Sequence, residues 1–229
     1  MQTIKPEPQS PPDQLRRRLF RGVYGGIGVL MAVQAKTALG AACASPSAIL
    51  SGNTSPRPGT GTTCSGGRSP GFWKVPQKFN YWTGAIPATF NPKVSISVCV
   101  NGMQNLSLND IKTQGTFLTN IFTGAPTGVG LWAVLAFPNA FPNGMLLRHL
   151  SAAYLNANFS WPGGVYPLSR TQIVEMWMAT KGGGLYCPGS MTCAPNTRWN
   201  AADVIKYISD MYDISADVGA DPDLCKKST

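Results

Sequence analysis

The sequence NGMLLRHLSAAYLNA, residues 143–157, predicts a helix with one apolar face. Its apolar side chains recur at spacings of three and four residues, which is the period of a single helix face. These side chains are Leu146, Leu147, Leu150, Tyr154 and Ala157. The segment belongs to the C-terminal half of the chain, which we expect to be mainly helical.

Two more helices are predicted after this one. Residues 169–180 open with a capping box, Ser169 followed by Gln172, and stop before Gly182. Asn200 caps the next helix, with Asp203 at its third position. Its expected inner face is formed by Val204, Ile205, Ile208 and Tyr212.

The residues Val94-Ser95-Ile96-Ser97-Val98-Cys99-Val100 predict one β-strand. Apolar and small polar residues alternate along it, which is typical of a half-buried strand. The strand could pair within the chain or with another subunit, so Val94, Ile96, Val98 and Val100 are candidate assembly residues. We therefore expect an α+β fold: a disulfide-stapled single domain with a small β element near residues 94–100.

The composition divides the chain into four parts. Residues 1–40 have the layout of a cleaved export signal, and Arg17-Arg18-Leu19-Phe20 resembles the twin-arginine type. Residues 41–68 are rich in Ser, Gly, Pro and Thr and predict an arm or linker. Residues 69–214 form the expected globular domain, and 215–229 form a tail that is acidic and then basic.

The six cysteines predict a disulfide framework in an exported chain. Cys187 and Cys193 bracket a short turn-rich loop and are the expected pair. The sequence leaves the other two pairs open, and one arrangement joins Cys64 to Cys99 and Cys43 to Cys225. Cleavage near Gly40 would leave all six cysteines, whereas cleavage after Ala44 would leave five, and lipidation of Cys43 is a third alternative.

Charge and hydropathy exclude several classes of protein. The 229 residues carry a formal net charge of +9, but only 13% are charged and 43% are hydrophobic, which argues against disorder. The basic residues of the expected domain are scattered rather than arranged in a stripe that could follow phosphates, so no nucleic-acid partner is expected. Apolar runs are too short for a membrane span in the mature chain.

Three short motifs resemble those of a family of secreted microbial proteins. Ser69-Pro70-Gly71-Phe72-Trp73-Lys74 is similar to that family's opening motif, S/T-x-G-Y/F-W-K. Residues 149–157 are similar to its later helix, H-x-x-A-A-x-L-N-A, and Tyr166-Pro167-Leu168 also matches. The resemblance covers residues 69–213 and implies an extracellular location without implying a chemistry. The chain departs from the family at Val75-Pro76, where Asn/Thr-His is usual.

Candidate catalytic groups are few. His149 is the single histidine and the obvious general base, yet no G-x-S-x-G nucleophile motif accompanies it. Glu175 could form a glycosidase pair with an aspartate only through tertiary contact. The tail residues Asp217, Asp221 and Asp223 lack the EF-hand spacing, and no C-x-x-C occurs, so neither a metal nor another cofactor is expected.

These observations favour a non-enzymatic exported protein. The first hypothesis is an extracellular or cell-surface structural protein, a filament or matrix subunit that forms a homo-oligomer or polymer. The second is a secreted carbohydrate-binding module whose partner is a polysaccharide. It would use some of the six tryptophans as stacking platforms, although they could equally be core residues. A secreted hydrolase that uses His149 is the remote third.

Overall fold

The computed structural model describes residues 45–51, 66–89, 107–160, 165–189 and 191–212. All of them belong to a unit that spans Leu39–Thr229. About 53% of the described part is helical. The α-helices are α2 (Pro46–Leu50), α3 (Pro70–Trp73), α5 (Leu108–Ile111), α6 (Leu131–Ala136), α7 (Gly144–Asn158), α8 (Arg170–Thr180) and α9 (Ala201–Asp210). The 3-10 helices are η1 (Pro76–Tyr81), η3 (Leu118–Asn120), η4 (Pro138–Ala140) and η5 (Pro195–Thr197).

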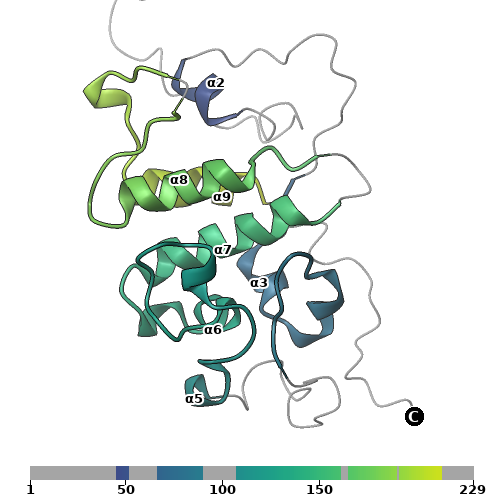
Figure 1. The fold of residues 1–229 in the computed structure, drawn as a ribbon. Helices are drawn as coiled ribbons and strands as arrows, with labels where there is room; N and C mark the ends of the chain where they lie inside the picture. Colours follow the sequence, from purple (N-terminus) through teal and green to yellow (C-terminus); the bar gives the residue numbers. More distant parts are fainter. Residues whose placement is uncertain (1–44, 52–65, 90–106, 161–164, 190, 213–229) are drawn as a thin grey trace, which may run out of the picture. The chain divides into compact units, whose positions relative to one another are not determined.

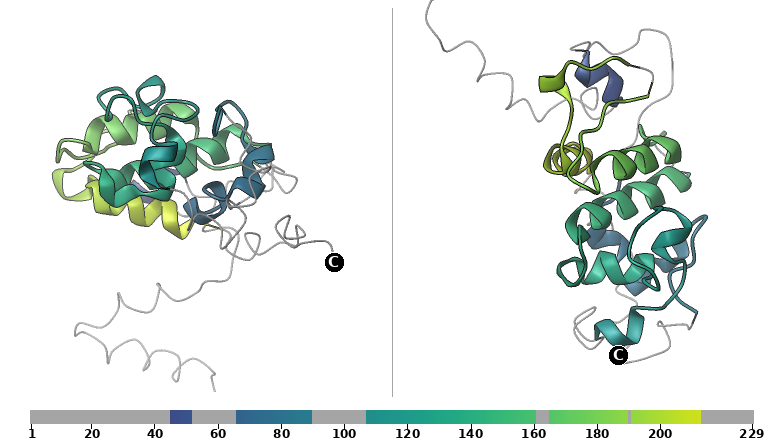
Figure 2. Two further views of the ribbon diagram at one scale, coloured as in Figure 1. Left: turned by 90° about the horizontal axis from the view of Figure 1, so that it is seen from below. Right: turned by 60° about the vertical axis from the view of Figure 1, so that its left-hand side comes forward.

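Helix α7 is the element around which the others pack. It contacts α8 and α9 on one side and α3 and α6 on the other, as Figures 1 and 2 show. It is buried on most of its circumference, because Ser151, Ala152, Ala153 and Asn156 are enclosed together with the leucines. A helix that is covered all round forms the centre of a domain rather than its surface.

The sequence predicted α7 well but underestimated its burial. Leu146, Leu147 and Leu150 are buried as expected, whereas Tyr154 and Ala157 pack against the core and stay partly exposed. Leu155 was missed as a core residue and is fully buried. A one-faced pattern could not indicate the second buried side, because small residues rather than large apolar ones form much of it.

The predicted starts of α8 and α9 are confirmed. Ser169 and Gln172 form the capping box of α8, and Asn200 with Asp203 forms that of α9. Val204 and Ile208 are buried as expected, but α9 ends at Asp210, so Tyr212 lies beyond it. The buried positions that were missed in this segment are Tyr207 and Met211.

The described residues contain only isolated β-bridges, not a sheet. These bridges pair Gly67 with Tyr212, Phe117 with Gly130, and Tyr186 with Trp199. The part that the structure describes is therefore mostly helical rather than mixed α+β. The predicted strand, with Val94, Ile96, Val98 and Val100, lies outside the described residues and stays a prediction.

Candidate functional site

Three hydrogen bonds between distant segments meet near the end of α7, around Asn156. The Asn156 side chain accepts a hydrogen bond from the Arg68 backbone N–H at 2.8 Å and donates one to the Arg68 carbonyl at 3.0 Å. It also accepts a hydrogen bond from the indole N–H of Trp73 at 3.2 Å. We call Gly67, Arg68, Trp73, Asn156 and Tyr166 the Asn156 junction.

Close approach at Gly67 explains why a glycine stands there. A Cβ atom at this position would lie 2.5 Å from Asn156 Nδ2 and 2.5 Å from Tyr166 Cε2. The Gly67 N–H donates to the Met211 carbonyl at 3.1 Å, so the backbone is also held on its other side. Burial raises the pKa of Tyr166, and nearby Tyr207 raises it further, so the phenol stays neutral at ordinary pH.

Members of all three motifs that carry the resemblance take part in or adjoin this junction. Trp73 comes from the first motif, Asn156 from the second and Tyr166 from the third. Ser69, also of the first motif, caps α3 by accepting a hydrogen bond from the Phe72 backbone N–H. The motif residues therefore join distant segments, which is a structural role.

Most of the described tryptophans are core residues. Trp73, Trp132 and Trp177 are almost fully buried, and Trp82 is 8% exposed. The indole N–H groups of the last three donate to the carbonyls of Lys74, Thr123 and Trp73, respectively. These side chains cannot stack on a sugar ring without unfolding the domain, so they do not form the platform that the carbohydrate hypothesis considered.

The only histidine also lies in a packing contact. His149 Nδ1 is 2.9 Å from the Tyr212 hydroxyl and 3.2 Å from Ser209 Oγ, and the ring stacks on Tyr212. Burial, assisted by the neighbouring Arg148 cation, lowers the pKa of His149 to about 4. The imidazole is therefore neutral at pH 7 and joins α7 to the end of α9.

Carboxylates of the described part serve as caps or surface charges. Asp203 accepts a hydrogen bond from the Asn200 backbone N–H, and Asp210 forms an exposed ion pair with Lys206 at 2.7 Å. Glu175 is exposed on α8. No group of three His, Cys, Asp or Glu side chains in the described residues could hold a metal ion. Asp217, Asp221 and Asp223 lie outside these residues.

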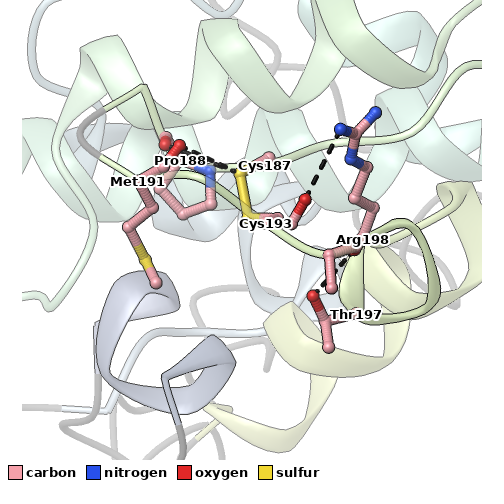
Figure 3. The surroundings of a disulfide bond; sticks show 7 residues. Cys187, Pro188, Met191, Cys193, Thr197 and Arg198 are labelled. Carbon is pink, nitrogen blue, oxygen red and sulfur yellow. Dashed lines mark hydrogen bonds between the residues drawn. A yellow bond between two sulfur atoms is a disulfide. The ribbon is translucent and has the colours of Figure 1, made fainter.

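The predicted disulfide is confirmed between Cys187 and Cys193, with Cα atoms 6.0 Å apart (Figure 3). The surrounding loop starts and ends at Tyr186 and Trp199, whose backbones exchange hydrogen bonds of 2.7 and 3.0 Å. The Arg198 guanidinium also donates to the Cys193 carbonyl at 3.4 Å. Cys43, Cys64, Cys99 and Cys225 lie outside the described residues, so their pairing stays a prediction.

A group of cationic and aromatic side chains was not found from the sequence. Lys78 Nζ lies 5.3 Å from the centre of the Phe72 ring and 5.8 Å from that of Tyr81, and the Arg68 guanidinium lies 5.5 Å from Phe72. We call Arg68, Phe72, Lys78 and Tyr81 the basic aromatic cluster. The spacing of Lys78 and Tyr81 was an available signal, because residues three apart eclipse on a 3-10 helix such as η1.

Comparisons with known proteins add no relative. The chain matches no protein-family model, no curated protein and no solved structure. In the described part of the chain, no helix is both long enough and apolar enough to cross a membrane.

Proposed function

We propose that the protein is an exported structural protein of the cell surface whose helical domain assembles with copies of itself. The observation that carries this proposal is that the side chains best suited to chemistry make structural contacts. His149 and Asn156 connect segments that are far apart in the sequence. These groups supply rigidity, and the Cys187–Cys193 disulfide adds a covalent constraint of the kind that persists in oxidising compartments.

Exposed apolar side chains where α7 and α8 meet support self-assembly. The Asn143 side chain donates to the Lys181 carbonyl at 2.8 Å, which brings the start of α7 to the end of α8. Met145, Met178 and Leu185 belong to the segments that meet at this bond, and they are 44%, 46% and 48% exposed. Burying such side chains against a second copy would be favourable, because apolar surface gains about 25 cal/mol per Å² when it leaves water.

Sedimentation velocity of the full, non-reduced chain tests the proposal. We expect assemblies that grow with concentration, and we expect Met178→Lys to reduce them about tenfold because it places a charge in the contact. Asn109→Lys on α5 is the matched control, since it adds the same charge at another exposed helical position. A monomer at every concentration, or equal effects of the two substitutions, would contradict self-assembly through this surface.

Electron microscopy of material from the native cells tests the cell-surface role. Regular filaments or sheets that bind an antibody to this chain are the expected result, and dispersed particles would oppose it. The predicted strand offers a separate route to assembly. If alanine at Val94, Ile96 and Val98 leaves the assemblies unchanged, exchange of that strand is not the route.

A further inference from the structure

We propose that the basic aromatic cluster binds an acidic polysaccharide. The cluster gathers two cations on one aromatic ring, because Arg68 and Lys78 both lie over Phe72. Lys78 extends between Phe72 and Tyr81, whose rings meet edge to face with their centres 5.5 Å apart. A cation that lies over an aromatic face is held in place, which reduces the entropy lost when it binds an anion.

The charge around the cluster favours an anionic ligand. Residues 66–89 contain Arg68, Lys74 and Lys78 and no acidic residue. Helix α7, whose C-cap residue Phe159 packs on Tyr81 with ring centres 5.5 Å apart, also contains no acidic residue. The two segments that meet here therefore contribute positive charge only, which attracts an anion at low and moderate salt.

The aromatic rings favour a sugar acid over other anions. Tyr81 and Phe159 are partly exposed, unlike the buried tryptophans, so a sugar ring can lie against them. A pyranose presents an apolar C–H face to an aromatic ring, while a carboxylate at its edge can reach Lys78. Asn80 is exposed on the same 3-10 helix and can bond to sugar hydroxyls. A uronic-acid polymer combines all three features.

This inference rests on export in the proposed function, since acidic polysaccharides are encountered outside the cell. It does not depend on self-assembly. Binding is measured in vitro, so the two proposals fail separately: sedimentation reports assembly, and the experiment below reports the ligand.

Affinity electrophoresis of the full chain in gels that contain polygalacturonate tests the site. The whole chain is used, so that the protein is tested as it exists. We expect retardation that fades as salt rises from about 0.05 to 0.5 M, because the contacts are charged. Fully methyl-esterified polygalacturonate has the same rings without the charge and should retard the chain about tenfold less.

Lys78→Met is the decisive variant, because methionine can keep the packing on Phe72 and Tyr81 while removing the cation. We expect it to weaken binding about fivefold to tenfold, the effect of one charge-assisted contact. Lys206→Met is the matched control: it removes the same charge from an exposed lysine on α9 and should leave binding within about twofold. Circular dichroism checks that both variants are folded.

Several results would overturn the proposal. These are no retardation by polygalacturonate, equal losses in Lys78→Met and Lys206→Met, and equal binding of the esterified polymer. Equally tight binding of single-stranded DNA would also overturn it, because it would show a general attraction to polyanions rather than recognition of a sugar acid.

Discussion

The Asn156 junction and the Cys187–Cys193 loop are held by different interactions, hydrogen bonds in the first and a disulfide in the second. Each holds an irregular segment against the helices. The junction does so with hydrogen bonds between residues 88 apart in the sequence, whereas the disulfide closes a separation of six residues. The junction therefore constrains the fold of the whole domain, and the disulfide constrains one loop.

This difference predicts unequal costs of disruption. Removing a buried polar side chain leaves its hydrogen-bond partners unsatisfied. Each unsatisfied partner lowers the free energy of unfolding by about 1–3 kcal/mol. A disulfide that closes a short loop removes little entropy from the unfolded chain, and it contributes roughly 2 kcal/mol on the chain-entropy model. The non-covalent junction should therefore be the more important of the two for stability.

The largest expected effect belongs to Asn156→Ala. The substitution removes the partner of the Arg68 N–H, the Arg68 carbonyl and the Trp73 indole together. We expect the free energy of unfolding to fall by about 3–5 kcal/mol, measured by urea denaturation.

Asn158→Ala is the matched control, because this nearby asparagine donates to the Tyr154 carbonyl one turn before it. We expect a loss of about 1 kcal/mol there. If the two asparagine variants are equally stable, the Asn156 junction does not hold the domain together.

Removing the disulfide comes second. The double substitution Cys187→Ala and Cys193→Ala should lower the free energy of unfolding by roughly 2 kcal/mol. Amide exchange should increase within residues 187–198 and stay unchanged at the Asn156 junction. Faster exchange at Trp73 or Asn156 would show that the loop and the junction unfold as one cooperative unit. That result would contradict the view that the disulfide constrains only its own loop.

The smallest expected effect concerns the contact of His149 with the end of α9. Its pKa of about 4 lies below the ordinary value of 6.5, so the unfolded chain binds more protons between these values. The contribution of this contact to the free energy of unfolding should be fully present above pH 6.5 and should decrease as the pH falls toward 4. The ring is partly exposed, so we expect a discounted loss of about 1 kcal/mol between pH 7 and 5.

His149→Gln should abolish this pH dependence, because the chain has no other histidine. Urea denaturation of both proteins at the two pH values provides the measurement. A slope that persists in the variant would assign the effect to carboxylates instead.

The Asn156 junction and the Cys187–Cys193 loop also differ in how far the sequence could predict them. The Cys187–Cys193 pair and the Ser169–Gln172 capping box were predicted correctly because both signals lie within seven residues. The sequence identified His149 as the single histidine, but it did not indicate that Tyr212 is its partner. Tyr212 was predicted only to lie on the inner face of a helix. Local spacing indicates an element and its ends, and it does not indicate what that element meets.

The Asn156 junction could not be predicted for the same reason. Its hydrogen bonds use the backbone of Arg68, and a backbone has no sequence signature. The closeness of Gly67 to Tyr166 likewise depends on the final packing. The basic aromatic cluster was missed because its two cations belong to different segments: Arg68 precedes α3, and Lys78 lies in η1.

The bridge between Gly67 and Tyr212 has a mechanical consequence. It is parallel, so tension applied through the two ends of the chain pulls its two segments in opposite directions along their length. This is a shearing load, under which the Gly67–Met211 hydrogen bond and the clamp of Asn156 on Arg68 must yield together rather than in succession. A domain under such tension would meet that resistance before its helices begin to separate.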